Sequence, residues 1–354
     1  MMSFTDIPNM LHAERTPCRL FCGYYFEIQF GGNQMKAVLI ENKELVMREI
    51  PNPVICEGEV LIRVEAAALN RADLLQREGN YPPPPGAPDW PGLEVAGTVK
   101  ESKSEKWKIG DRVCALLPGG GYAEFAAAPG DMCMPVPAGL TMAQASALPE
   151  AFATAYLNLF LEGGAKAGDT LLMHAGASGL ASVVIPMAKA FGLRVITTVL
   201  NAEIAKKISH LKANVVVDTS TENIADVLKR EAETGHPVDI AIDCLGNQML
   251  GDCLPYVARN CRWIIIATLA GDTSVINMKT MYMKGIRLIG STLRSKTHEK
   301  KAEILALLVS TVWGKIETGE LVPTVYAELP LECAKEAQDI LYRGENVGKV
   351  VLTV

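Results

Sequence analysis

The stretch of sequence that decides the fold is Asp169-Thr170-Leu171-Leu172-Met173-His174-Ala175-Gly176-Ala177-Ser178-Gly179-Leu180-Ala181-Ser182. An apolar strand runs into a turn of small residues and then into the start of a helix. Such a turn lets backbone N–H groups and the helix N-terminus approach a pyrophosphate closely. The spacing differs from GxGxxG, because Ala181 stands where a third glycine is expected, and an ordinary strand–turn–helix corner uses the same residue types. Alone, the motif leaves both interpretations open.

Apolar strand candidates alternate with helical stretches on both sides of this motif. Strands that are buried on both faces read as continuous apolar runs, so the rhythm predicts a doubly wound parallel sheet. Six such strands match a dinucleotide-binding fold, which favours cofactor binding by residues 156–295. The predicted strands are Thr170 to His174, Arg194 to Val199, Val215 to Val217, Val238 to Asp243, Trp263 to Ala267 and Ile286 to Ile289.

Residues 35–155 have a different pattern of short β-branched runs between turn residues, which predicts a barrel-like all-β unit. Pro82 to Pro85 lack donors and have a fixed φ, so they predict a loop at a surface or cleft. Residues 296–354 return to helical patterns and then to a closing strand, which we expect to rejoin the β unit. The other predicted elements are strands opening at Met35 to Ile40, Val60 to Ala66, Glu94 to Val99, Gly110 to Val113 and Gly348 to Val354, and helices at Ala302 to Thr318 and Leu331 to Arg343.

Length and composition exclude several classes of protein. A chain of 354 residues with 49% hydrophobic side chains suggests two domains, and its net charge of −6 argues against a nucleic-acid partner. No apolar run reaches the roughly 18 residues of a membrane span. Nine scattered cysteines favour a reducing, cytoplasmic compartment. Residues 1–34 lack the long apolar core of a signal peptide, and we expect a disordered or unrelated extension. Asp6, Glu14 and Glu27 argue against a mitochondrial presequence, whereas Arg15 and Arg19 keep that alternative open.

Ordered motifs from Met35 to Val354 resemble the zinc-free quinone oxidoreductase branch of the medium-chain dehydrogenase/reductase superfamily, related to zeta-crystallin. Those around Gly79 to Pro85 and Leu293 to Ser295 resemble its p53-inducible quinone oxidoreductase subgroup. The resemblance implies a GroES-like catalytic domain at 35–155, a Rossmann NAD(P)-binding domain at 156–295 and a return to the catalytic domain at 296–354. The other matching motifs are Ala68 to Leu74, Pro91 to Gly97, Lys108 to Val113, Gly119 to Glu124, Pro149 to Ala155, Gly176 to Ala181 and Val347 to Val350.

Zinc ligands are missing at the positions that this resemblance marks. Zinc alcohol dehydrogenases of the superfamily carry Cys where Asn70 stands and Gly-His-Glu in place of Gly92-Leu93-Glu94. No cysteine lies between Cys56 and Cys114, so the structural zinc lobe is absent too. Without a Lewis acid, reduction of an electrophilic quinone or enone is better served than alcohol oxidation. We therefore expect no metal and a small planar acceptor.

The resemblance also implies roles for individual residues. Asn70 and Tyr81 would flank the nicotinamide or the acceptor, although Tyr81 alternatively packs only against the proline loop. Thr154 would contact the nicotinamide end, or else bond back to the preceding helical turn. Glu94 carries a proton relay or, as we favour, a buried ion pair. Residues assigned to the cofactor are Thr154, Gly176, Ala177, Ser178, Gly179, Leu180, Asn201, Leu269, Leu293, Arg294 and Lys349, the last being a family lysine or a plain surface residue.

The choice of cofactor favours NADPH, with NADH as the alternative. The strand that ends in Thr197-Thr198-Val199 lacks the acid that reads a ribose 2′-hydroxyl. Glu203 and Thr219 stand where the family has a phosphate-binding Lys and Tyr, so Asn201, Lys206 or Lys207 would have to substitute.

Two alternatives to a quinone reductase stay open. One is a 2-alkenal, enone or enoyl reductase of the same fold. The other is a low-turnover NADPH-binding sensor or structural protein, which the departures at Ala181, Glu203 and Thr219 keep in play. The resemblance further implies a homodimer joined through the cofactor domains.

Overall fold

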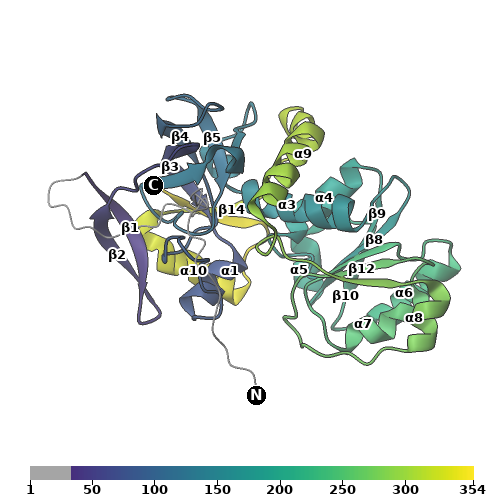
Figure 1. Ribbon diagram of the computed structural model, residues 1–354. Coiled ribbons are helices and arrows are strands. Elements are labelled where there is room, and N and C mark those ends of the chain that lie inside the picture. The colour runs from purple at the N-terminus through teal and green to yellow at the C-terminus, as the bar shows by residue number, and fades with distance from the viewer. Residues whose placement is uncertain (1–32) are drawn as a thin grey trace, which may run out of the picture.

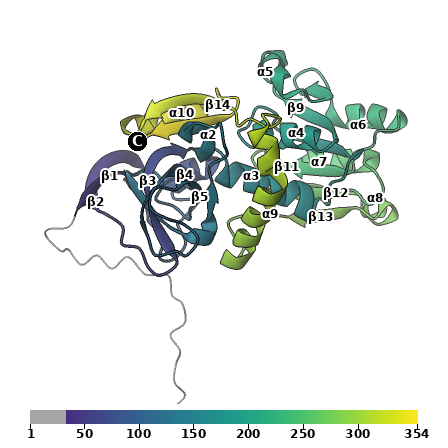
Figure 2. The ribbon, with the colours of Figure 1, turned by 90° about the horizontal axis from the view of Figure 1, so that it is seen from above.

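The computed structural model describes residues 33–354, so the prediction for the first 32 residues lies outside the described part. Two lobes, each built on its own sheet, lie on either side of helices α3 (Pro149–Tyr156) and α9 (His298–Glu317), as Figures 1 and 2 show. Within residues 33–354, no helix combines the length and the apolar character that crossing a membrane requires.

One lobe contains a six-stranded parallel sheet in the order β10-β9-β8-β11-β12-β13. Counted along the chain from β8, this is the order 3-2-1-4-5-6 of a dinucleotide-binding fold. All six predicted strands are confirmed, with ends shifted by at most two residues. The bounds are β8 Thr170–Met173, β9 Arg194–Val199, β10 Val215–Asp218, β11 Ile240–Asp243, β12 Arg262–Ile265 and β13 Arg287–Gly290, with helices α4 Ala181–Ala190, α5 Ala202–Lys207, α6 Ile224–Glu233, α7 Gln248–Cys253 and α8 Met278–Lys284.

The other lobe contains a seven-stranded sheet in the order β14-β15-β3-β4-β5-β7, with β6 also paired to β3. A separate hairpin of β1 and β2 lies beside it. The strand predicted at Gly110 to Val113 begins only at Arg112, because Gly110 occupies a turn with φ +94°. The bounds are β1 Gln34–Glu41, β2 Glu44–Pro51, β3 Glu59–Ala68, β4 Glu94–Ser102, β5 Arg112–Leu116, β6 Phe125–Pro129, β7 Cys133–Pro135, β14 Val325–Pro330 and β15 Lys349–Thr353, with helices α1 Arg71–Arg77, α2 Met142–Ser146 and α10 Ala334–Arg343.

The end of the chain returns to the β-rich lobe, as the sequence predicts. Strand β15 pairs antiparallel with β3 and parallel with β14. The predicted helices at the C-terminal end correspond to α9 and to α10 with the short turn before it. The domain boundaries at 155 and 295 stay predictions, because α3 and α9 pack on each other and contact strands of the β-rich lobe.

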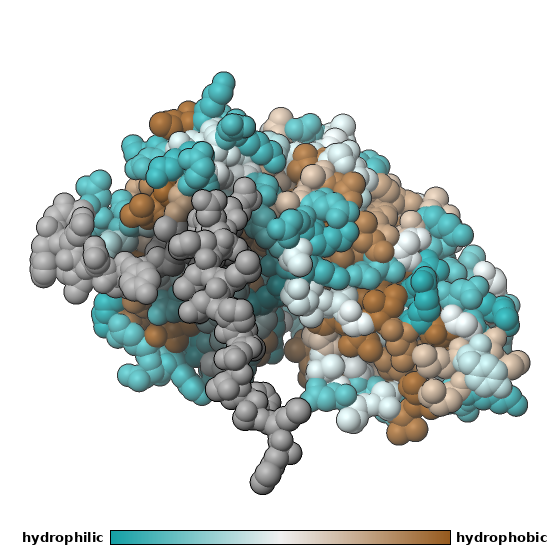
Figure 3. All heavy atoms as spheres, viewed as in Figure 1, coloured by the Kyte–Doolittle hydropathy of each residue, from teal (hydrophilic) through white to brown (hydrophobic). Residues whose placement is uncertain are grey.

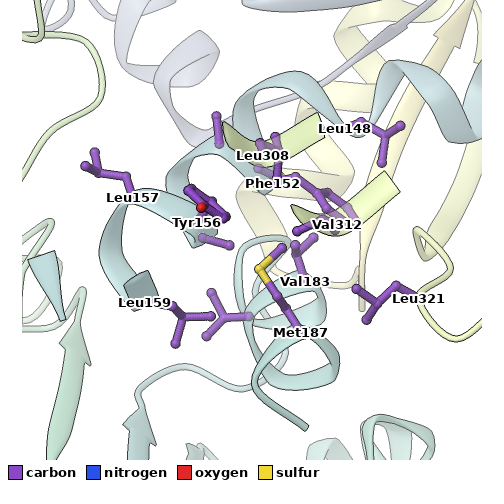
Figure 4. Close-up of a cluster of buried hydrophobic side chains, with 14 of the residues drawn as sticks. Leu148, Phe152, Tyr156, Leu157, Leu159, Val183, Met187, Leu308, Val312 and Leu321 are labelled. Carbon is purple, nitrogen blue, oxygen red and sulfur yellow. The ribbon is translucent and has the colours of Figure 1, made fainter. Parts of the chain in front are cut away.

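A continuous hydrophobic core joins the two lobes where α3, α4 and α9 meet, as Figure 4 shows. Phe152 of α3, Met187 of α4 and Leu308 of α9 are buried in this cluster. Apolar side chains from both lobes share the core, so relative movement of the lobes would expose apolar surface. The cleft between them is therefore lined by well-supported elements.

Candidate active site

A buried ion pair lies where β4, β15 and the start of α1 meet. The Lys349 Nζ is 2.7 Å from Glu94 Oε1, and the two side chains are 4% and 0% exposed. Asn70 closes the arrangement, since its Oδ1 accepts from Lys349 Nζ at 2.7 Å and its Nδ2 donates to Glu94 Oε1 at 2.9 Å. The ion-pair interpretation of Glu94 is confirmed. The alternative that Lys349 is a surface residue is wrong, because its side chain is buried and pairs with the buried Glu94.

Glu94 also accepts a hydrogen bond from a backbone N–H group at the start of helix α3. Its Oε2 accepts from the backbone N–H of Glu150 at 2.8 Å. The first N–H groups of a helix lack partners within the helix, and α3, with Pro149 in its first turn, has no capping side chain of its own. The Glu94 carboxylate, at the start of strand β4, therefore supplies the missing acceptor and positions Glu150 at the cleft.

Two further carboxyl groups in this region have raised pKa values. Burial, followed by the charge of Glu94, raises the pKa of Glu150 to about 7, although Lys349 and Lys301 act in the opposite direction. Burial raises the pKa of Asp73 to about 6, even though Asp73 accepts hydrogen bonds from two backbone N–H groups and from the Tyr122 hydroxyl. Both carboxyls therefore hold protons over part of the neutral pH range.

A narrow inner pocket brings predicted and unpredicted residues together. Tyr81, Leu293 and Arg294 were assigned to the site from the sequence, whereas Glu150 and Lys301 were not. The pocket has a volume of about 30 Å³ and adjoins a second cavity of about 300 Å³ that shares several of its lining residues. Its lining is completed by Pro84, Leu93, Leu116, Leu117 and Pro118.

Tyr81 is held by more than the proline loop. The guanidinium carbon of Arg294 lies 3.9 Å from the centre of the Tyr81 ring, a cation–π contact. Arg294 also donates a hydrogen bond to the carbonyl oxygen of Pro82, which fixes the guanidinium to the same loop. The ring is thus oriented from across the cleft, and packing against prolines alone does not describe it.

Thr154 lies one turn after Glu150 in α3. Its hydroxyl donates to Glu150 Oε1 at 3.4 Å. This confirms the alternative that Thr154 bonds back to the preceding helical turn, and the partner in that turn is a carboxyl side chain. Thr154 consequently orients Glu150.

The turn between β8 and α4 has open backbone donors. Within the described chain, the N–H groups of Ala177, Gly179 and Leu180 make no hydrogen bond, whereas those of Gly176 and Ser178 are paired internally. A Cβ on Gly176 would lie 2.5 Å from Thr197 Oγ1, so only glycine fits this close approach to β9. Open N–H groups at the start of a ten-residue helix fit an anionic pyrophosphate.

The remaining predicted cofactor residues lie at the carboxyl ends of the parallel strands. Asn201 caps α5, its side-chain oxygen accepting from Ile204 N–H at 3.0 Å. Glu203 is 77% exposed and pairs with Lys207 at 3.2 Å. The Thr219 hydroxyl donates to the carbonyl oxygen of Val199 at 3.0 Å, and Leu269 is exposed. Among residues 33–354, no three His, Cys, Asp or Glu side chains gather in an arrangement that could hold a metal ion.

Comparison with known proteins identifies both lobes. Residues 56–138 match the alcohol dehydrogenase GroES-like domain, and residues 179–310 match the zinc-binding dehydrogenase domain. The chain is 32% identical to mouse (Mus musculus) quinone oxidoreductase over 305 residues, which cover 85% of this chain and 90% of that protein. It belongs to the quinone oxidoreductase-like medium-chain dehydrogenases/reductases.

Two more relatives support this assignment. Human (Homo sapiens) quinone oxidoreductase is 30% identical over 309 residues, which cover 86% of this medium-chain dehydrogenase/reductase and 92% of the human protein. A mycobacterial protein solved in complex with NADPH superimposes with a TM-score of 0.79 at 28% identity, covering 90% of this chain and 100% of that one. The medium-chain dehydrogenase/reductase described here is thus an oxidoreductase with a GroES-like domain and an NAD(P)-binding Rossmann fold.

Asp73, Glu150 and Lys301 of this medium-chain dehydrogenase/reductase escaped sequence reasoning. The one local signal is the Pro149-Glu150 pair, since proline followed by an acid is typical of a helix start. Nothing local indicates that Glu94, Lys301 and Lys349 lie near enough to act on the Glu150 carboxyl. Their importance rests on contacts between segments that are far apart in the sequence.

Proposed function

We propose that this protein reduces quinones with NADPH and without zinc. The observation that carries the proposal is the inner pocket, which contains Leu293 and Arg294 from beyond the end of β13 together with two proton-bearing groups. Burial raises the pKa of the Tyr81 phenol above its ordinary value, and the pKa of Glu150 is about 7. Conversion of a quinone to a quinol takes up two electrons and two protons. A pocket with proton donors at the cofactor edge of the sheet suits this reaction.

The open N–H groups of Ala177, Gly179 and Leu180 would hold the pyrophosphate of the cofactor. When bound, NADPH supplies a hydride, equivalent to two electrons and one proton. The second proton comes from Glu150 in this proposal. The Thr154 hydroxyl, 3.4 Å from Glu150 Oε1, helps to orient the carboxyl that would supply this proton.

Tyr81 would form one wall for a planar acceptor. Arg294 anchors the ring, so little side-chain freedom remains to be lost when a quinone stacks on it. The phenol can in addition donate a hydrogen bond to a quinone oxygen. Asn70 and Lys349 act indirectly in this proposal, because they hold the Glu94 side chain in place.

NADPH is preferred over NADH in this proposal. The mycobacterial neighbour is complexed with NADPH. Within the part of the chain that the structure describes, the side-chain amide of Asn201 keeps its N–H₂ group available, since the cap uses only the oxygen. Lys206 and Lys207 lie in the same short helix as Glu203, which opposes a 2′-phosphate only from an exposed position.

Zinc-independent catalysis is supported by the side chains at the two positions where zinc alcohol dehydrogenases carry zinc ligands. Asn70 is engaged with Glu94 and Lys349, and Leu93 is a buried apolar wall of the inner pocket. Neither is a zinc ligand in proteins. Metal analysis of the purified protein checks this, and one tightly bound zinc per chain with activity lost on chelation would contradict it.

A homodimer joined through the Rossmann lobes forms part of the proposal. Strand β13 lies at the edge of its sheet, with unpaired backbone groups on one side. Large apolar side chains are exposed on and beside α8, and Figure 3 shows hydrophobic surface on this lobe. They are Val275, Met278, Tyr282 and Met283. Light scattering at micromolar concentration should give a dimer, and a monomer would refute this part.

The cytoplasmic location and the p53-inducible subgroup stay predictions. Six cysteines of the described chain, Cys114, Cys133, Cys244, Cys253, Cys261 and Cys333, are free thiols, which suits a reducing compartment. Fractionation of the source cells, with a cytoplasmic marker followed in parallel, tests the location. Recovery of the protein with a sealed compartment would contradict it.

Oxidation of NADPH and NADH against a panel of quinones, 2-alkenals and enones tests the function as a whole. We expect turnover with quinones and a lower KM for NADPH than for NADH. Faster reduction of alkenals or enones would favour the alternative enzyme class. Tight NADPH binding without turnover of any acceptor would favour a sensor or structural protein.

A further inference from the structure

The larger cavity beside the inner pocket has two chemically different walls. Its volume is about 300 Å³, at the lower end of the range for small-molecule sites. One wall is apolar and includes five prolines, Pro84, Pro85, Pro88, Pro118 and Pro129. The other wall carries the cations Arg294, Lys296 and Lys301 together with His298, and all four follow the last strand of the parallel sheet. A ligand matched to both walls is apolar on one side and anionic on the other.

The basic side chains of this wall differ in the contacts that they already make. Lys296 Nζ pairs with Glu162 at 2.9 Å, and His298 Nε2 lies 2.8 Å from Asp131 Oδ2. Arg294 is held by Tyr81 and the Pro82 carbonyl oxygen. Within residues 33–354, the Nζ of Lys301 makes neither a hydrogen bond nor an ion pair.

Lys301 is also partly buried. Its side chain is half-buried between the inner pocket and the larger cavity, both of which it lines. Two carboxyl groups lie in these linings, but each has another partner. Glu59 accepts the N–H of Cys56 at 2.7 Å, and Glu150 accepts from Thr154. Glu150 interacts electrostatically with Lys301 without forming a hydrogen bond or an ion pair with it. A partly desolvated ammonium without a directly contacting anion is unfavourable, and an anionic ligand group relieves that cost.

We propose that the larger cavity is a subsite for an acidic substituent of the acceptor, so that the substrate is an amphipathic organic anion. Its carboxylate or sulfonate pairs with Lys301, and its apolar body lies along the proline wall. The reducible carbonyl then extends into the inner pocket toward Tyr81 and Glu150. The assignment of the reducible end rests on the proposed function, whereas the anion subsite itself does not.

The proposed place for the cofactor phosphates is separate from both pockets. The open N–H groups of the turn at 175–180 belong to the parallel-sheet lobe, and neither pocket includes them in its lining. A ligand of the larger cavity should therefore bind together with NADPH.

Equilibrium binding to the full chain tests the subsite without any turnover. The probes are 2-naphthalenesulfonate and its neutral counterpart 2-naphthalenesulfonamide, measured by titration calorimetry with and without saturating NADPH. We expect the sulfonate to bind at least about tenfold more tightly, with the difference shrinking as salt rises. Lys301→Met should remove this preference and leave sulfonamide binding unchanged.

Lys300→Met is the matched control, because Lys300 lies next to Lys301 in α9 and pairs with Glu303 at 2.9 Å. It should retain the wild-type preference, and thermal unfolding of both variants confirms that they fold. Equal binding of the two probes, an unaltered preference in Lys301→Met, or competition between sulfonate and NADPH would each overturn the proposal. Sulfonate binding that depends on Lys301, in a protein that turns over no quinone, would uphold the subsite and refute only the proposed function.

Discussion

The cofactor side and the acceptor side of the proposed site are built from different kinds of group. The cofactor side offers backbone N–H groups from one continuous turn at 175–180. The acceptor side offers side chains from segments that range from residue 70 to residue 349. The two sides meet at Gly179, where an added Cβ would lie 3.3 Å from Lys349 Cδ.

This difference determines how each side tolerates change. Backbone donors persist as long as the turn keeps its shape, so Ala181 is accepted where a third glycine is expected. The acceptor side depends on charges whose behaviour is set by burial and by neighbours. We therefore expect substitutions on the acceptor side to have larger effects than those on the cofactor side.

The largest effect should come from removing the buried cation. Lys349→Met leaves the Glu94 carboxylate buried without its counter-ion and should lower the free energy of unfolding by about 3–5 kcal/mol. Denaturant titration measures it. The double variant Glu94→Gln/Lys349→Met removes both charges and should recover most of the loss. Lys335→Met, which breaks an exposed pair with Asp339, is the control and should cost below about 1 kcal/mol. A similarly small loss for Lys349→Met would show that the pair is unimportant.

The next effect concerns the acceptor wall. Tyr81→Ala should lower kcat/KM for quinones by about 1–3 kcal/mol of transition-state stabilisation, tenfold or more, with unchanged NADPH affinity. Tyr81→Phe retains the ring under Arg294 and isolates the hydroxyl. It should be nearly silent if stacking dominates and should match the alanine variant if the phenol donates to the quinone oxygen. Full turnover of several quinones by Tyr81→Ala would show that Tyr81 serves only in packing.

A pH profile tests the proton donor. The acid form of Glu150 is present below its pKa of about 7 and is lost above it, so kcat/KM should fall as the pH rises through 7. Lys301 lowers this pKa, so Lys301→Met should move the fall to higher pH. Glu150→Gln should remove the fall along with much of the activity. A wild-type profile that stays flat from pH 6 to 8.5 would exclude Glu150 as the donor.

The smallest effect is expected on the cofactor side. Glu203→Lys should tighten NADPH binding and leave NADH binding unchanged, because a 2′-phosphate meets a cation in place of an anion. Glu203 is 77% exposed and already paired with Lys207, so the gain should stay below about 1 kcal/mol, or about fivefold. Fluorescence titration at low and high salt measures it. An unchanged dissociation constant for NADPH at low salt would place Glu203 away from the adenosine ribose.

The sequence by itself determined the parallel sheet, the turn that follows β8, the return of the last strand and the family. These features depend on hydrophobic periodicity and on motifs read within a few residues, so neighbouring positions carry the information. It also indicated Asn70, Tyr81 and Lys349, through the resemblance. Only the tertiary structure decided that Lys349 is buried against Glu94, that Arg294 covers Tyr81, and that Glu150 holds its proton near neutral pH. A pKa or an ion pair depends on burial and on distances between segments hundreds of residues apart, and these quantities exist only once the chain has folded.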